Sequence, residues 1–228
     1  MSELAYHMQE LEIARARDDL RRVVPVLSDR FESVLDVGCG AGQALIACEI
    51  SPTTFTCGVD IDQEALALGR RLSQRIAFVR ASGERLPFSD GSFDVVISRV
   101  SLPYMRLPVA LREIARVLRP GGQVWFTLHS ISITLEGVAR SIKERNAKNL
   151  AYQLYVIVNG LLFHFTGRLF RPPFNRAGCE SFQTARGIVR AMRAAGFDQV
   201  RPDNRGRIFV VTASAPRAAP GDAAGVAR

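Results

Sequence analysis

Three glycines, Gly38, Gly40 and Gly42, occupy every second position directly after the apolar segment 34–37. Glycine has no Cβ, so a turn of this kind lets a ligand approach the backbone closely. The N-terminal amides of a helix that follows would favour a carboxylate or another anion. A dinucleotide fingerprint would have its third glycine at position 43, which is Gln43 here. The spacing therefore predicts a nucleoside ligand without the pyrophosphate of NAD.

This turn resembles the first motif of the class I S-adenosylmethionine-dependent methyltransferases. Residues 78–88 resemble the third motif of the broad family that includes the ubiquinone and menaquinone methyltransferases, and residues 93–98 and 113–122 resemble its remaining motifs. The resemblance is close over residues 30–130 and loose over 184–213. It implies S-adenosylmethionine as the cofactor and transfer of its methyl group to an acceptor.

Under this resemblance, the carboxyl ends of the first strands hold the cofactor. Asp36 would balance the cofactor's ammonium group, directly or through water; the alternative is that Asp36 caps its own turn. Asp60, 24 residues further on, would accept hydrogen bonds from the ribose hydroxyls, and otherwise is an ordinary loop acid. Ile61 would pack on the adenine. The residues that we assign to the cofactor are Asp36, Gly38, Cys39, Gly40, Gly42, Asp60, Ile61, Ser82, Gly83, Glu84 and Ser98.

Ser82 departs from the pattern of the family. Members usually have an acidic residue at this position, which accepts a hydrogen bond from the adenine amino group. Ser82 can accept the same bond, but without the charge that strengthens it. We therefore expect a weaker adenine contact, or help from Glu84.

Three side chains are candidates for acceptor chemistry: His129, His164 and Tyr104. An activated sulfonium requires mainly that the reactants are positioned and water is excluded, and a base is needed only where the acceptor must lose a proton. Either histidine would suit that role, and each has a structural role as its alternative. Tyr104 would line the acceptor pocket. Arg99 would either contact an acidic acceptor or lie in solvent, and we predict no metal site.

The elements that must position these residues alternate between strand and helix. Strands are predicted over residues 33–37, 54–60, 76–80, 93–98, 123–129, near 199–201 and over 207–213. Helices are predicted over 3–29 with a bend at Pro25, from the glycine turn to about 49, and over 63–74, 108–118 and 184–195, with Asp62 as an N-cap and 119–122 as a stop. With the resemblance, this predicts an α/β fold: a Rossmann-like, doubly wound, seven-stranded sheet, mostly parallel with an antiparallel last strand, helices on both faces and a helical cap insertion.

The predicted organisation is an N-terminal helical segment (1–30), a cofactor-binding core (31–130), a helical cap (131–180), the C-terminal part of the core (181–213) and a disordered tail (214–228). The cap divides into a charged helical part, about 135–149, and an apolar part, 150–165. An apolar cap suits a lipophilic acceptor. The alternatives are packing on the sheet, a homodimer through this insertion, or a membrane-surface helix with Arg168, Arg171 and Arg176 at the headgroups. The last would require a polar opposite face, which this all-round apolar run lacks.

Composition favours a cytoplasmic protein of one domain. The net charge of +8 comes almost entirely from scattered arginines, which indicates a solvated surface and makes a nucleic-acid partner unexpected. The four cysteines form no C-x-x-C pair and are predicted to be reduced core thiols, with Cys39 a small turn residue. The chain opens with a charged helical segment rather than a signal peptide, and the apolar run 150–165 is too short and polar to span a bilayer.

The sequence thus predicts a methyltransferase that acts by in-line transfer on a small lipophilic or aromatic acceptor through a hydroxyl, an amine or a carbon. One alternative is a non-catalytic scaffold that binds the cofactor, which Ser82 favours. A second is an NAD(P)-dependent reductase, which Gln43 opposes. A third is an RNA-modifying methyltransferase, which only the positive charge suggests.

Overall fold

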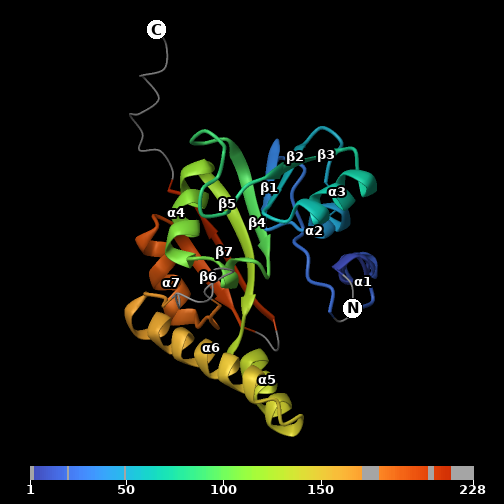
Figure 1. The fold of residues 1–228 in the computed structure, drawn as a ribbon. Helices are drawn as coiled ribbons and strands as arrows, with labels where there is room; N and C mark the ends of the chain where they lie inside the picture. Colours follow the sequence, from blue (N-terminus) through green and yellow to red (C-terminus); the bar gives the residue numbers. More distant parts are fainter. Residues whose placement is uncertain (1–2, 20, 49, 171–179, 205–207, 217–228) are drawn as a thin grey trace.

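The computed structural model describes residues 3–216 except residues 20, 49, 171–179 and 205–207 (Figure 1). The strands are β1 (Ser33–Val37), β2 (Phe55–Asp60), β3 (Ile76–Arg80), β4 (Phe93–Arg99), β5 (Leu118–His129), β6 (Asp198–Asp203) and β7 (Ile208–Ser214). The helices are α1 (Glu3–Arg15), α2 (Gln43–Ala47), α3 (Gln63–Leu72), α4 (Leu107–Val117), α5 (Ile131–Lys143), α6 (Ala147–Thr166) and α7 (Ala185–Ala194), with a 3-10 turn, η1 (Leu102–Tyr104).

The strands form one seven-stranded sheet in the order β3-β2-β1-β4-β5-β7-β6. Strands β1 to β5 are parallel, whereas β7 is antiparallel to both β5 and β6. The predicted topology is therefore confirmed. The chain leaves β1 toward β3 and returns to the other side of β1 at β4, and this reversal of strand order opens a crevice at the carboxyl ends of the strands.

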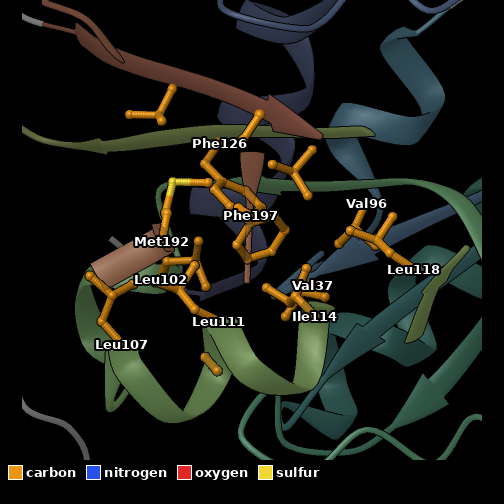
Figure 2. Close-up of a cluster of buried hydrophobic side chains, with 14 of the residues drawn as sticks. Val37, Val96, Leu102, Leu107, Leu111, Ile114, Leu118, Phe126, Met192 and Phe197 are labelled. Atoms are coloured by element: carbon orange, nitrogen blue, oxygen red, sulfur yellow. The ribbon is translucent and has the colours of Figure 1, made fainter. Parts of the chain in front are cut away.

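The larger hydrophobic core lies between the sheet and the helices α4 and α7. Figure 2 shows side chains of α4, among them Leu111 and Ile114, directed at Val37, Val96 and Phe126 of the sheet. The buried positions of α4 recur three and four residues apart and are fully inaccessible, so the helix presents one apolar face. Burying each large side chain stabilises the fold by about 1.5–3 kcal/mol.

The opposite face of the sheet packs against α2 and α3. Neighbouring residues on a strand point to opposite faces, so Val34 belongs to this second cluster while Leu35 belongs to the first. Leu45 of α2 and Leu66 of α3 complete the second cluster. Helices thus cover both faces of the sheet, as predicted. Asp62 caps α3 as expected, accepting hydrogen bonds from the amides of Glu64 and Ala65.

The first helix is shorter than the predicted span of 3–29. Helix α1 ends at Arg15, and the described residues between it and β1 are irregular. The Asp19 carboxylate accepts a 2.8 Å hydrogen bond from the backbone amide of Arg21, an interaction that competes with helical hydrogen bonding. Pro25 further on has no amide hydrogen to donate.

Residues 119–122, predicted to stop a helix, do follow the end of α4, but they lie inside β5 rather than in a turn. Phe93 pairs with Leu118 and Val95 pairs with Gln123, so four residues of β5 bulge opposite one residue of β4. Gly121 accommodates the bulge with a φ of 76°, and its amide donates to the carbonyl of Pro216. The helix itself already ends at Val117.

The predicted cap forms an antiparallel hairpin of α5 and α6 at one end of the molecule, with its turn directed away from the sheet (Figure 1). Residues 144–146 separate α5 from α6. The Asn146 side chain caps α6 by accepting a hydrogen bond from the amide of Asn149. The cysteines Cys39, Cys48 and Cys57 are buried and free. Cys179, Arg171 and Arg176 lie outside the described residues, as does most of the predicted tail.

Candidate functional site

A cavity of about 220 Å³ opens at the carboxyl ends of β1, β2 and β4, where the strand order reverses. The elements that surround it are α1, the glycine turn, the end of β2 and the segment after β4. Its lining residues are Tyr6, His7, Glu10, Asp36, Gly38, Cys39, Gly40, Gln43, Ala44, Asp60, Arg99, Val100, Ser101 and Tyr104. The structure therefore brings together six of the residues predicted to bind the cofactor or line the acceptor pocket, which are Asp36, Gly38, Cys39, Gly40, Asp60 and Tyr104.

The glycine turn is built on left-handed backbone conformations, with φ of 74° at Gly38, 54° at Gly40 and 79° at Gly42. A Cβ on Gly38 would lie 2.2 Å from that of Ser101, and one on Gly42 would lie 2.8 Å from the Phe78 ring. Gly42 is thus required by packing against the sheet and does not line the cavity. The sequence predicts that a ligand approaches the backbone of the turn closely. At Gly42, the group that makes this close approach is the Phe78 ring.

Four backbone amides of the turn are already hydrogen-bonded within the chain. The amides of Gly38 and Cys39 donate to the Val59 carbonyl at 2.7 and 3.0 Å, and that of Gly42 donates to the Cys39 carbonyl at 2.8 Å. The amide of Gly40 donates to Oδ2 of Asp60 at 2.7 Å. These bonds hold β1, β2 and Asp60 in place, and the contact of the turn with a ligand carboxylate stays a prediction.

Asp60 is fixed at the end of β2 by both of its oxygens. Oδ2 accepts from Gly40, and Oδ1 accepts from the amide of Asp62 at 3.0 Å. A carboxylate has about four acceptor sites, so each oxygen retains capacity for a further donor. A pair of ribose hydroxyls in the cavity would meet an oriented acceptor that needs no rearrangement.

Asp36 lies in the floor of the cavity with 1% of its surface exposed. Among the described residues, none is hydrogen-bonded to its Oδ1. Burial raises the pKa of this carboxyl to about 7, although Arg99 acts to lower it, and the nearby Asp60 raises it further. A buried carboxylate oxygen without a partner is costly, and a ligand ammonium is the group that would offset this cost.

Helix α1 covers the cavity through contacts that the sequence did not reveal. The Gln43 side chain, which stands at the position of the missing third glycine, contacts Nδ1 of His7 at 2.9 Å. Arg99 of β4 forms an ion pair with Glu10 of α1. Arg99 is thus held in an ion pair rather than simply solvated, and its contact with an acidic acceptor stays a prediction. One residue could have indicated these contacts from the sequence: Gln43, a long polar side chain in the glycine turn, which the structure shows to be buried.

A polar cluster lies beside Tyr104, which lines the cavity. The Tyr104 ring packs edge-on against the His129 ring, with centroids 5.3 Å apart. Nδ1 of His129 lies 3.2 Å from Oε1 of Glu180, and the other oxygen of Glu180 accepts a hydrogen bond from the Tyr152 hydroxyl of α6. Burial, and then Glu180, raise the pKa of Tyr104, which keeps its phenol neutral. Glu180 was not identified from the sequence, because it is distant from His129 along the chain.

Several predicted site residues lie outside the cavity lining. Ser98 is fully buried and donates its hydroxyl hydrogen bond to the Val37 carbonyl at 2.7 Å. Gly83 is packed so that a Cβ would lie 2.6 Å from Val37. The Nδ1 of His164 contacts the Thr184 hydroxyl at 2.7 Å, at the start of α7. Ser98 and His164 thus have structural partners, and neither lies on the cavity lining.

The predicted adenine contacts stand on the open rim beyond Asp60. Ile61 and Ser82 are exposed after β2 and β3, where the flat base of a nucleoside could lie between them. The carboxylate of Glu84 accepts two hydrogen bonds from Arg106, at 2.8 and 2.6 Å. These bonds direct the Glu84 oxygens toward the start of α4, and the expected help from Glu84 in binding the adenine stays a prediction.

Comparison with known proteins matches residues 35–126 to a family described as methyltransferase domain. A fatty-acid O-methyltransferase of Mycolicibacterium smegmatis is 39% identical over 99 residues, covering 41% of this chain and 36% of that protein. A 27-O-demethylrifamycin SV methyltransferase of Amycolatopsis mediterranei is 32% identical over 141 residues, covering 57% of this chain and 51% of that protein. The chain thus aligns with about a third to a half of the length of these curated relatives.

The fold is shared with solved structures at low sequence identity. An S-adenosylmethionine-dependent methyltransferase of Thermotoga maritima superposes with a TM-score of 0.55 at 16% identity, covering 93% of this chain and 90% of that one. The segment matched by the family model contains Asp36, the glycine turn and Asp60, but neither α1 nor the α5–α6 hairpin.

Proposed function

We propose that the chain contains a class I S-adenosylmethionine-dependent methyltransferase domain and that the protein methylates a lipophilic acceptor beside Tyr104. The observation that carries the proposal is the pair of carboxylates in the cavity: Asp36, buried with an oxygen that lacks a partner among the described residues, and Asp60, oriented with acceptor sites to spare. These two groups match the ammonium and the ribose hydroxyls of the cofactor.

In this proposal, different residues of the chain bind different parts of the cofactor. Asp36 would pair with the ammonium in a site from which water is largely excluded, where charge pairs are strong. Asp60 would accept from the ribose hydroxyls, and Ile61 and Ser82 would flank the base. When bound, the cofactor supplies an electrophilic methyl group that needs no further activation.

The apolar hairpin and the names of the relatives support the proposed acceptor class. The relatives named above act, by their names, on a fatty acid and on a rifamycin, and both acceptors are largely apolar. In this chain β5 ends at His129, and α5 begins directly after the next residue, Ser130. The hairpin would therefore stand next to the acceptor side of the cavity. Apolar walls with a few polar groups are typical of sites for such molecules.

The His129–Glu180 pair would serve an acceptor that must lose a proton. Glu180 lies within hydrogen-bond reach of Nδ1, and a proton on Nδ1 leaves the lone pair of Nε2 free to act as a base. Tyr104, which packs on the His129 ring, would align the acceptor. A carboxylate acceptor has no proton to lose near neutral pH and would not use this pair.

The test is methyl transfer measured by mass spectrometry with two acceptors of equal chain length, a fatty acid and the corresponding fatty alcohol. We expect product from at least one of them, and none with boiled enzyme. Methyl transfer to neither of these acceptors nor to extracted small molecules would contradict the proposal and favour a non-catalytic scaffold. Transfer to RNA alone would also overturn it.

The variants His129→Asn and Glu180→Gln test the role of the pair. Both should lower kcat with the alcohol by about 10²-fold or more, the range of general-base catalysis, and leave the fatty acid reaction within about threefold. Thr184→Val removes the partner of the other candidate histidine, His164, and should change neither reaction. Equal losses with both acceptors would show that His129 supports the structure rather than the proton transfer.

A further inference from the structure

Exposed apolar side chains gather on the α5–α6 hairpin. Of the seventeen large apolar residues that are exposed in the described part of the chain, ten lie within residues 131–170. Surface apolar residues scattered singly are ordinary, whereas a concentration on one element indicates a binding surface. The hairpin lies at one end of the molecule, with its turn away from the sheet, as Figure 1 shows.

The exposed residues of α6 form one continuous stripe. Leu154, Val158, Leu161 and Phe165 follow at steps of four, three and four residues, which places them on one face of the helix. Their exposed fractions are 52%, 64%, 44% and 67%. The opposite face is occupied within the protein, where Phe163 is fully buried. The stripe is therefore directed outward and is not part of the core.

The turn of the hairpin is strongly basic. Residues 140–148 contain four basic side chains, Arg140, Lys143, Arg145 and Lys148, against one glutamate, and all of them are exposed. Both lysines of the whole chain lie here. Ile142, between these charges, is 61% exposed. Apolar side chains flanked by an excess of positive charge are complementary to a binding surface with an apolar interior and a negatively charged outer layer.

We propose that the α5–α6 hairpin docks on the surface of an anionic lipid bilayer. The apolar stripe would enter the boundary between headgroups and acyl chains, and the basic turn would face the lipid phosphates. None of the helices in the described part of the chain is long and apolar enough to cross a membrane, so the hairpin lies on the bilayer. A second copy fits less well, because the chain has a net charge of +8 and like charges brought together across an interface are unfavourable.

Docking would bring the acceptor side of the cavity toward the membrane. Helix α5 begins two residues after His129, and Tyr152 of α6 hydrogen-bonds to Glu180. A lipophilic acceptor dissolved in the bilayer would then reach Tyr104 without crossing bulk water. The inference concerns binding to lipid and holds whether or not the proposed reaction is correct.

The experiment is sedimentation of the full chain with vesicles of phosphatidylcholine alone or mixed with an equal part of phosphatidylglycerol. We expect binding to the mixed vesicles that is at least tenfold tighter than to the neutral ones and that falls as salt rises from 0.1 to 1 M. Lys143→Glu with Lys148→Glu should weaken it about 20-fold or more. Val158→Ser with Phe165→Ser should weaken it about tenfold.

Matched controls carry the same chemical changes elsewhere. Arg71→Glu with Arg112→Glu makes the same charge change on exposed positions of α3 and α4, and Val26→Ser with Phe55→Ser makes the same apolar change. Both should bind within about threefold of the wild type, and circular dichroism confirms the fold of every variant. Failure to bind either vesicle, equal loss in the controls, or a dimer in solution that the Val158 and Phe165 substitutions abolish would each overturn the proposal.

Discussion

Asp36 occupies an environment that the fold alone does not explain. Its carboxyl is buried, and among the described residues no donor reaches its Oδ1. Burial without a partner raises its pKa to about 7 from an ordinary value of 3.8. Proteins tolerate such a cost at sites that bind a ligand, where the missing partner comes from outside.

Asp36→Asn should therefore stabilise the free protein in a way that depends on pH. Between pH 3.8 and about 7 the unfolded chain releases a proton that the folded chain retains, so the stability contribution of Asp36 falls as pH rises and is fully lost above about pH 7. Asparagine does not titrate, so the variant does not lose this stability as pH rises. At pH 8 we expect the variant to be about 2–4 kcal/mol more stable, and at pH 5 much less so.

Thermal unfolding at pH 5 and pH 8 is the measurement, with Asp29→Asn on the exposed surface as the control. The difference between Asp36→Asn and the wild type should grow with pH, while Asp29→Asn should follow the wild type at both values. A destabilised Asp36→Asn at pH 8 would show that the carboxylate has a structural partner.

The glycine turn illustrates, at the scale of an element, what a sequence pattern does and does not reveal. Alternating glycines predicted a tight turn after β1, and the three positive φ angles confirm it. The pattern did not reveal that Gly42 makes room for the Phe78 ring, or that four amides of the turn are used within the chain. Such contacts depend on the packing of β3 and β2 against the turn, which local sequence does not encode.

Gly42→Ala should be more destabilising than Gly91→Ala. Both residues have positive φ, 79° and 64°, so both substitutions cost about 1 kcal/mol of backbone strain. A Cβ at position 42 would also lie 2.8 Å from the Phe78 ring, whereas one at position 91 would meet nothing within 4 Å. We expect a total loss of about 2–4 kcal/mol for Gly42→Ala in urea unfolding. Equal losses would mean that the ring moves aside freely.

Helix α4 shows where sequence patterns are most reliable. Its apolar residues recur at helical spacing, and the structure buries them against the sheet. The α1 contacts with the cavity could not be predicted in the same way, because Glu10 and Arg99 are distant along the chain and neither lies in a motif. The bulge in β5 was missed because Pro120-Gly121-Gly122 is equally typical of a turn.

Ile114→Ala tests the buried face of α4 directly. Ile114 is fully buried in the cluster of Figure 2, so its truncation removes apolar contacts and leaves a cavity. We expect a loss of about 2–5 kcal/mol in the free energy of unfolding. Arg112→Ala on the exposed side of the same helix should change it by less than about 0.5 kcal/mol. Comparable effects of the two substitutions would contradict the assigned face.

At the scale of the whole molecule, the sheet gathers chemistry that is dispersed along the chain. The reversal of strand order between β1 and β4 brings Asp36 and Asp60 to one edge, with Tyr104 after β4 and His129 at the end of β5. Helix α1 covers the cavity beside the glycine turn, and the α5–α6 hairpin begins two residues after the end of β5. The predicted doubly wound sheet indicated where the cavity lies, whereas the contacts that α1 and Glu180 make around it came only from the structure.

Calorimetric titration with S-adenosylhomocysteine tests the central claim most directly, because this product carries the same ammonium and ribose as the cofactor but has no methyl group to transfer. We predict micromolar binding by the wild type, a loss of at least tenfold in Asp36→Asn and in Asp60→Asn, and wild-type affinity in Asp29→Asn. Binding that is undetectable in the wild type, or unchanged when both cavity carboxylates are replaced, would contradict the account.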